Sequence, residues 1–173
     1  ELRENIDDDW DVAFDPHAKI FSPIKALQLA NALAPYDPLF YEEPLRPENS
    51  DAWAKLRSQM TVPLATGESL YTRFEFLDLL SKDGADIIQP DIQWVGGMTA
   101  CVKICNMAAS AGIEVCLHGG GRDPYGQHLC WATSNMPWCE YYIGSDPGVP
   151  LEEVSQPGAL IPRDSYLEFQ AKG

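Results

Sequence analysis

The chain has 173 residues with 26 acidic and 12 basic side chains, so its formal charge is −14 and its pI is about 4.4. This acidic excess excludes a general nucleic-acid binder, which needs a basic face to displace counterions, and argues against adhesion to anionic membranes. Hydrophobic residues make up 45% and charged residues 22%, which is typical of a globular domain rather than of a disordered chain.

Short apolar runs alternate along the chain with longer helical patterns. Strands are predicted at 11–14, 38–41, 62–65, 85–88, 113–117 and 138–142. Helices are predicted between them, from Ser22 to Pro35 and at 50–60, 72–82, 98–111 and 125–134. Residues 146–173 are predicted to form an irregular tail, because Pro and Gly are frequent there. The alternation predicts an α/β fold with about six parallel strands in a single unbroken domain.

The apolar runs and the cysteines both indicate where in the cell the protein is expected to be. No apolar run approaches the roughly 18 residues of a membrane helix, and the acidic N-terminus lacks a signal-peptide pattern. The five cysteines are scattered, odd in number and without a CxxC pair. We therefore expect a cytoplasmic protein with reduced, mostly buried thiols and no membrane or nucleic-acid partner. Cys101 and Cys105 lack further ligands at metal spacing, which indicates helix packing rather than a zinc site.

Each predicted strand runs into a side chain that can bind a metal or move a proton. These residues are 22 to 27 positions apart, which is about one βα unit. In a closed parallel barrel all of them would lie on the carboxyl-end rim, where such folds hold their sites. A doubly wound sheet would spread them over roughly 25 Å. The pattern therefore favours a barrel, and the residues are Asp15, Glu42, Glu68, Asp91, His118 and Glu140.

Three carboxylates in succession, those of Asp15, Glu42 and Glu68, would repel one another if left bare. Oxygen-only ligands of this kind suit Mg²⁺, which takes a few carboxylates and leaves positions for water and substrate. The alternative is that each acid only caps the helix that follows its strand.

Two histidines stand close to these acids. Asp91 and His118 end neighbouring strands, and a carboxylate beside an imidazole orients it as a general base. His17 lies two residues beyond Asp15, so in an extended chain both side chains face the same way. His17 is therefore expected to lie across the metal from His118, and the alternative is a solvated loop histidine. His128 falls within a predicted helix and is interpreted as structural, and Trp53, Trp94, Trp131 and Trp138 as core residues.

At this point the sequence resembles the enolase superfamily, in its mandelate racemase subgroup, and especially the acid-sugar dehydratases of galactonate, rhamnonate and mannonate type. Each motif is short, but their order and spacing together are specific. The motifs are Phe14-Asp15-Pro16-His17, Tyr41-Glu42-Glu43-Pro44-Leu45, Thr66-Gly67-Glu68-Ser69, Asp86-Ile87-Ile88-Gln89-Pro90-Asp91, Gly96-Gly97, Leu117-His118-Gly119 and Glu140.

The resemblance implies roles for these residues. It implies Mg²⁺ held by the carboxylates at positions 15, 42 and 68. It implies a His118–Asp91 dyad that moves the proton α to a carboxylate, and a hydrogen bond from Glu140 to the carboxylate oxygen on which charge builds. His17 would act on the departing hydroxyl, as in galactonate- and mannonate-type dehydratases. Ser69 departs from the rhamnonate-type pattern, and the glycine run 119–121 departs from the galactonate type.

A full family member would also carry a capping domain and an eight-stranded (β/α)₇β barrel, and would be about twice as long. We therefore expect residues 1–173 to be the C-terminal portion of such a barrel, without the cap and the first strands. The expected function is Mg²⁺-dependent dehydration of a sugar acid (an aldonate) to a 2-keto-3-deoxy acid. A racemase or epimerase, or an inactive truncated fragment, are the alternatives. The expected partner is a small-molecule sugar acid, and the full-length protein is expected to form a homo-oligomer.

Overall fold

The computed structural model describes residues 2–7 and 9–168. In this part of the chain four short strands form one sheet in the order β1-β2-β3-β4, and every neighbouring pair is parallel. The strands are β1 (Tyr41–Glu42), β2 (Leu64–Thr66), β3 (Ile87–Ile88) and β4 (Glu114–Val115). The helices are α1 (Pro23–Leu33), the 3-10 helix η1 (Ala34–Tyr36), α2 (Ser50–Arg57), α3 (Arg73–Ser81), α4 (Met98–Ser110), α5 (Pro124–Ala132) and α6 (Leu151–Val154).

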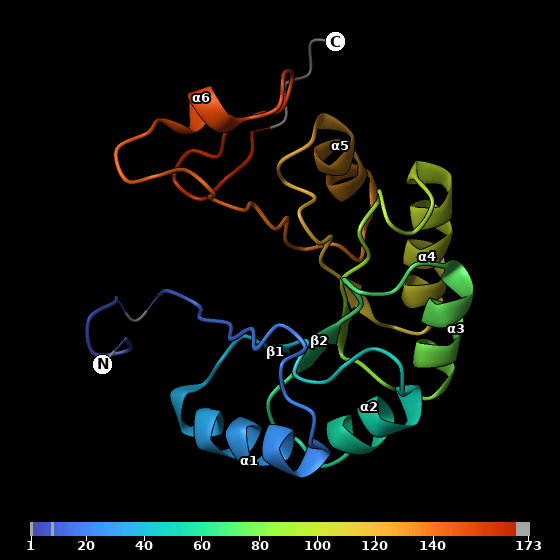
Figure 1. The fold of residues 1–173 in the computed structure, drawn as a ribbon. Helices are drawn as coiled ribbons and strands as arrows, with labels where there is room; N and C mark the ends of the chain where they lie inside the picture. Colours follow the sequence, from blue (N-terminus) through green and yellow to red (C-terminus); the bar gives the residue numbers. More distant parts are fainter. Residues whose placement is uncertain (1, 8, 169–173) are drawn as a thin grey trace.

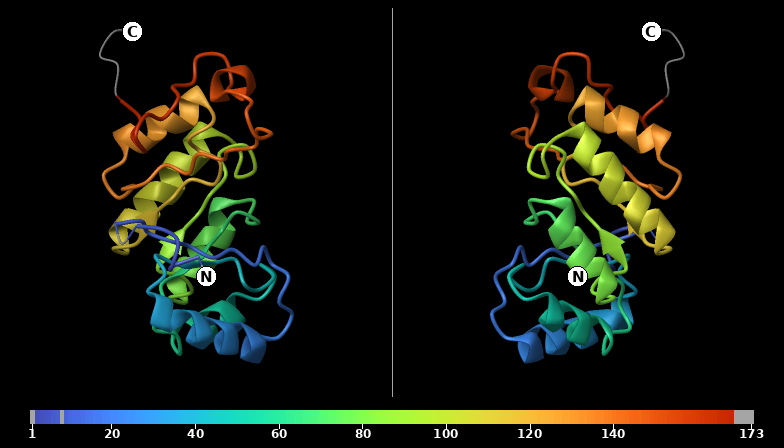
Figure 2. Two further views of the ribbon diagram at one scale, coloured as in Figure 1. Left: turned by 90° about the vertical axis from the view of Figure 1, so that its left-hand side faces the viewer. Right: turned by 90° about the vertical axis from the view of Figure 1, so that its right-hand side faces the viewer.

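Strands and helices follow one another along an arc. Helices α1 to α5 lie on the outer side of the strands, and the N-terminal segment and the C-terminal tail lie at the open side (Figure 1). The side views place α1 and α2 at one end of the arc and α5 with the tail at the other (Figure 2). The arrangement is a succession of βα units, as the sequence predicts.

Local sequence signals explain where two of the helices begin. The hydroxyl of Ser22 accepts a hydrogen bond from the backbone N–H of Lys25, and Pro23 occupies the first turn of α1. Thr72 and Glu75 form a reciprocal capping box at the start of α3. Both helix starts were predicted from these residues, and the predictions are confirmed.

The core is divided between the two faces of the strands. Side chains that point outward from the sheet pack with Trp53, Phe76 and Ile104 of the helices, and a smaller cluster lies on the other face. Because side chains alternate along a strand, the residue two positions beyond an inner-face residue also faces inward. Glu42 follows Phe40, and His118 follows Cys116, in this way. The outward set includes Leu64, Ile88, Val115 and Leu117, and the inner set is Phe40, Ala65, Ile87 and Cys116.

The first and the last predicted strands are not strands of this sheet. Segment 11–14 runs beside β1 but forms only an isolated parallel bridge between Phe14 and Tyr41. Segment 138–142 has no strand structure, although the carbonyl of Glu140 accepts a hydrogen bond from the N–H of Gly121 at 2.7 Å. Both segments lie at the ends of the arc, where a strand can find a hydrogen-bonding neighbour on at most one side. The sheet therefore has four strands in the described residues rather than about six.

The predicted irregular tail contains some local structure. Within its described part, α6 makes a single helical turn, and Arg163 and Tyr166 form an isolated antiparallel bridge. Gln127 of α5 ties the tail down, because its amide accepts from the N–H of Leu160 at 2.9 Å and donates to the carbonyl of Leu160 at 2.7 Å. Residues 169–173 of the predicted tail lie outside the described residues. Among the described helices, none is both long and apolar enough to cross a membrane.

Candidate functional site

The six polar residues singled out in the sequence come from consecutive segments of the arc. Asp15 follows the bridge residue Phe14, and Glu42 is the last residue of β1. Glu68, Asp91 and His118 follow β2, β3 and β4 within two or three residues. Since the strands are parallel, their carboxyl ends meet at one edge. Glu140 reaches this edge from the segment after α5.

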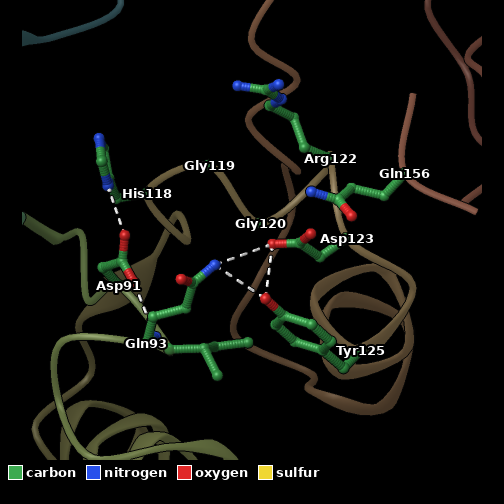
Figure 3. A pocket seen from close by; sticks show the side chains of 10 residues that line it. Asp91, Gln93, His118, Gly119, Gly120, Arg122, Asp123, Tyr125 and Gln156 are labelled. Carbon is green, nitrogen blue, oxygen red and sulfur yellow. Dashed lines mark hydrogen bonds and ion pairs between the residues drawn. The ribbon is translucent and has the colours of Figure 1, made fainter. Parts of the chain in front are cut away.

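Asp91 and His118 form a hydrogen-bonded pair. Nδ1 of His118 lies 3.0 Å from Oδ2 of Asp91, as Figure 3 shows. The other oxygen of Asp91 accepts the backbone N–H groups of Gln93 (2.7 Å) and Trp94 (3.2 Å). These bonds fix the carboxylate, so it can fix the imidazole in turn. The second ring nitrogen, Nε2, is left facing the site.

Glu68 lies between the two histidines. One carboxylate oxygen is 3.3 Å from Nε2 of His118, and the other is 3.0 Å from Nδ1 of His17. The Glu68 side chain is 9% exposed, whereas His118 is 32% and His17 is 60% exposed. The buried carboxylate of Glu68 thus lies between the imidazoles of His17 and His118, both of which are more exposed than Glu68.

The segment around His17 has an unusual backbone. His17 and Ala18 both have positive φ, of 53° and 54°. The N–H of His17 donates to Oδ1 of Asp15 at 2.5 Å, and the N–H of Ala18 donates to the carbonyl of Glu43 at 2.6 Å. Non-glycine residues in this conformation are sparse and cluster at functional sites. The bend places Nδ1 of His17 3.4 Å from Oδ2 of Asp15.

The charges of the site shift the pKa values of its groups. Burial raises the pKa of Glu42 to about 7, opposed by a hydrogen bond from Gln89 and reinforced by the charges of Asp15, Glu140 and Glu68. Burial also raises the pKa of Glu68, while the charges of the two histidines lower it. These four carboxylates are therefore close enough to influence one another.

His118 has a raised pKa through competing effects. Burial of the imidazole lowers its pKa. The hydrogen bond with Asp91 and the charges of Glu140, Glu68 and Asp91 raise the pKa by more than burial lowers it, so the net shift is upward. Glu140 lies beside this histidine, because its Oε2 accepts the N–H of Gly119 at 3.1 Å. An imidazole with raised proton affinity suits the role of a general base.

The metal-ligand prediction concerns Asp15, Glu42 and Glu68. In the described residues, no three His, Cys, Asp or Glu side chains stand in a ready arrangement around one point where a metal ion could bind. Each oxygen of Glu68 faces an imidazole nitrogen instead. The structure thus gathers the predicted residues at one edge without arranging them as a finished coordination shell.

Sequence reasoning did not single out the buried polar side chains behind the site. Glu43 is fully buried; its Oε2 accepts from the Thr66 hydroxyl and from the N–H of Gly67, and its Oε1 has no hydrogen-bond partner. Gln89 is 1% exposed, and its Oε1 likewise has no partner. The signal was present in the sequence, since both polar residues fall beside apolar strand residues where a core residue is expected.

A cleft of about 220 Å³ opens next to His118. Figure 3 shows its polar wall, in which the Tyr125 hydroxyl donates to Asp123 at 2.7 Å and the Gln93 amide donates to the Tyr125 oxygen at 2.9 Å. Arg122 and Gln156 also line it. The cleft lies on the side of His118 where Asp91 binds, rather than on the side of Glu68.

The remaining histidine and the tryptophans are placed as follows. His128 is on the exposed side of α5 and packs edge-on against Trp131. Trp53 is 1% exposed and belongs to the core, as predicted. The core prediction is wrong for Trp94 and Trp138, which are 48% and 36% exposed. Trp94 follows the strand end, so its ring lies above the rim and stacks on Tyr71.

All five cysteines are free thiols. Cys101, Cys105 and Cys116 are buried, whereas Cys130 and Cys139 are only partly buried. Cys101 and Cys105 belong to the core cluster through α4, which confirms their interpretation as packing residues.

Comparison with known protein families identifies the family to which this chain belongs. The model of the enolase C-terminal domain-like family matches residues 1–173, and the chain belongs to this family. D-galactonate dehydratase of Klebsiella pneumoniae (strain 342) is 38% identical over 118 residues, which are 68% of this chain and 31% of that protein. The chain thus spans about a third of the length of the curated relatives that it matches.

Solved structures agree with this family. An enolase from Agrobacterium radiobacter bound to Na and L-malate is 51% identical, with a TM-score of 0.77 over 82% of this chain and 37% of that chain. L-Talarate dehydratase from Polaromonas sp. JS666, complexed with Mg and L-glucarate, is 29% identical, with a TM-score of 0.75 over 82% of this chain and 38% of that chain. The arc of parallel βα units is therefore part of an enolase-type barrel, as the motifs implied.

Proposed function

We propose that this chain contributes the proton-transfer half of a Mg²⁺-dependent sugar-acid dehydratase, which removes the α-proton and the β-hydroxyl of an aldonate to give a 2-keto-3-deoxy acid. The observation that carries the proposal is the placement of two imidazoles on the two oxygens of Glu68, with one of them also bound to Asp91. The dehydratase activity of relatives and the Mg and sugar acid bound to the Polaromonas protein support it.

The donor set fits a hard divalent cation. Asp15, Glu42 and Glu68 offer only carboxylate oxygens, which Mg²⁺ prefers. Burial first, and then the neighbouring carboxylates, raise the pKa of Glu42 to about 7. A bound cation would stabilise the charged form of this carboxylate. These three residues would hold the ion. When bound, Mg²⁺ would stabilise the negative charge that develops on the substrate carboxylate as the α-proton leaves.

The chain's own groups would divide the proton transfers between them. Nε2 of His118 would take the α-proton, since Asp91 holds Nδ1 and thereby fixes the tautomer. His17, on the other side of Glu68, would give a proton to the β-hydroxyl so that it leaves as water. Glu140, held by the N–H of Gly119, would donate a hydrogen bond to the carboxylate oxygen if it is protonated. The resulting enol would then become the keto acid.

The same geometry suits a second activity. Two bases on opposite faces of an α-carbon would make a racemase or epimerase, and His17 and His118 approach Glu68 from opposite oxygens. The two activities differ in product, because an epimerase returns the proton to the α-carbon and releases no water.

The location and assembly of the protein are part of the proposal. Five free thiols suit a reducing compartment, so we place the reaction in the cytoplasm. In a longer protein the open edges of the four-stranded sheet would be covered by the remaining strands of the barrel, and we propose that this longer protein is a homo-oligomer.

The test uses D-galactonate with Mg²⁺ in D₂O, followed by NMR, together with a chemical assay for 2-keto acids. We expect both α-deuterium incorporation and keto acid from the wild-type chain. His118→Asn should lose both, whereas His17→Asn should lose the keto acid and keep the exchange. Deuterium incorporation without any keto acid from the wild type would favour the epimerase. Equal loss of both signals in His17→Asn would overturn the division of roles.

A further inference from the structure

Two of the five thiols lie in contact, one on α5 and the other on the segment that follows this helix. Sγ of Cys130 donates a hydrogen bond to Sγ of Cys139, and the two sulfur atoms are 3.2 Å apart. Both side chains are only partly buried. Sulfur atoms that are already in contact need only a small movement to reach bonding distance. The pair therefore has the proximity and the access that thiol–disulfide exchange requires.

The other three cysteines are much less accessible. Cys101 and Cys105 are 0% and 2% exposed, and both lie on α4, where the helix fixes their separation. Cys116 is 4% exposed and packs on the inner face of the sheet. A thiol buried in apolar surroundings is inert, since a reagent cannot reach it and its thiolate is disfavoured. The partly buried pair is thus the one that a reagent in solution can reach.

The contact between the two sulfur atoms gives the thiols different roles. The hydrogen bond from Cys130 lowers the pKa of Cys139, against the opposing effects of burial and of the Glu140 charge. The same hydrogen bond raises the pKa of Cys130, and burial raises it further. Because the thiolate is the nucleophile in exchange, Cys139 would attack first and Cys130 would resolve the intermediate.

The pair also lies next to a residue of the candidate site. Cys139 immediately precedes Glu140, whose side chain accepts the N–H of Gly119 at 3.1 Å. Segment 138–142 has no strand structure, and the carbonyl of Glu140 accepts the N–H of Gly121 at 2.7 Å. A covalent link between the two sulfur atoms would hold this segment against α5. The oxidation state of the pair would thus act on the backbone that carries Glu140.

We infer that Cys130 and Cys139 form a reversible redox site, which a low-molecular-weight disulfide such as oxidised glutathione converts into a disulfide bond. The Cys139 thiolate attacks one sulfur of the reagent, whose S–S bond breaks and releases one thiol. Cys130 then attacks the Cys139 sulfur of the mixed disulfide, gives up its proton and displaces the second thiol. The cysteine pair is oxidised by two electrons, and the reagent is reduced to two thiols. In a reducing compartment such disulfides are usually transient and serve catalysis or redox sensing. This inference does not depend on the proposed function.

The experiment treats the folded full chain with oxidised glutathione, alkylates the remaining thiols with iodoacetamide and maps the tryptic peptides by mass spectrometry. Cleavage after Arg122 and Arg163 places Cys130 and Cys139 together in peptide 123–163 and every other cysteine outside it. We expect this peptide to be lighter by two hydrogen atoms and to carry no alkyl group, so that two of the five free thiols are lost. A reducing agent should restore both thiols.

Two single variants test the order of attack. Cys130→Ser should retain one glutathione on Cys139, because no second thiol can displace it, whereas Cys139→Ser should take up none. The matched control is Cys105→Ala, which removes a buried thiol from α4 and should still form the disulfide. Matching circular dichroism spectra would show that the three variants are folded. Equal uptake of glutathione by the two serine variants would overturn the assigned roles.

Hydrogen exchange at Gly121 tests the effect on the neighbouring segment. Its N–H, bound to the carbonyl of Glu140, should exchange more slowly in the oxidised chain than in the reduced chain. An unchanged exchange rate would overturn the effect on the segment that carries Glu140. The redox site itself would be overturned if peptide 123–163 of the wild type kept both thiols, or if the disulfide formed with any of the three other cysteines.

Discussion

Replacing Gly126 by alanine should destabilise the protein, although alanine is the better helix former. Gly126 lies in the first turn of α5. An added Cβ would lie 2.1 Å from the carbonyl oxygen of Gly120 and 2.8 Å from its carbonyl carbon. Both are backbone atoms of the loop that follows His118, so neither can rotate away as a side chain would. The helix and the loop would have to separate.

The magnitude follows from two opposed effects. Alanine in place of glycine favours a helix by roughly 0.5–1 kcal/mol. Overpacking a tight contact costs roughly 1–3 kcal/mol, and a backbone clash this close belongs at the upper end. The net loss is expected to be about 2 kcal/mol. With a urea slope of about 2 kcal/mol per M, the unfolding midpoint should fall by about 1 M.

The assay is urea unfolding followed by circular dichroism, with Ala109→Gly as the control. Ala109 is exposed on α4, so there the exchange between alanine and glycine reports helix propensity alone, with a loss of roughly 0.5–1 kcal/mol. Glycine should thus be the worse residue at 109 and the better one at 126. A Gly126→Ala protein as stable as the wild type would refute the reasoning, because it would mean that the helix does not pack tightly on the loop.

Two further predictions concern the packing of α2 and α3. Trp53→Ala should lower the free energy of unfolding by about 3–5 kcal/mol, because the side chain is 1% exposed and its Nε1 donates to the carbonyl of Arg46 at 3.0 Å; a loss below about 1 kcal/mol in urea unfolding would contradict this. Hydrogen bonds from the hydroxyl of Ser50 and then from Lys82 lower the pKa of Asp78. The Asp78 carboxylate therefore stabilises the folded state at pH values above its unfolded-state pKa. This stabilisation is lost as the pH falls through the folded-state pKa. Asp78→Asn should therefore be less stable than the wild type at pH 7 and equally stable at strongly acid pH, whereas a difference independent of pH would show that the charge is not responsible.

The sequence predicted the succession of βα units because each unit carries its own signals. The Ser22-Pro23 and Thr72–Glu75 caps fixed two helix starts, and all four central strands were found at or near their predicted positions. The strand predictions at 11–14 and 138–142 failed for a different reason. Apolar composition is a local property, but a strand exists only where a neighbour supplies hydrogen bonds, and the sequence does not show which neighbours are present.

The sequence predicted which polar side chains follow the strands, but not how these side chains contact one another. Strand-end positions were sufficient to bring Asp91 and His118 together, since parallel strands share one edge. The sharing of Glu68 between two imidazoles could not be predicted, because it depends on the left-handed backbone at both His17 and Ala18, and alanine rarely adopts that conformation. Glu43 was overlooked, although it lies beside apolar strand residues, because the Thr66 hydroxyl and the Gly67 N–H that bind its carboxylate come from the next βα unit of the chain.

The central claim is that the acids at the strand ends share one divalent cation beside two histidines, and Mn²⁺ can test it in place of Mg²⁺. The chain has only three histidines, so their ring protons are resolved reporters. Paramagnetic Mn²⁺ added in substoichiometric amounts should broaden the signals of His17 and His118, spare that of His128 on α5, and lose this selectivity in Glu68→Gln. Equal broadening of all three signals, or none at His17 and His118, would contradict the account.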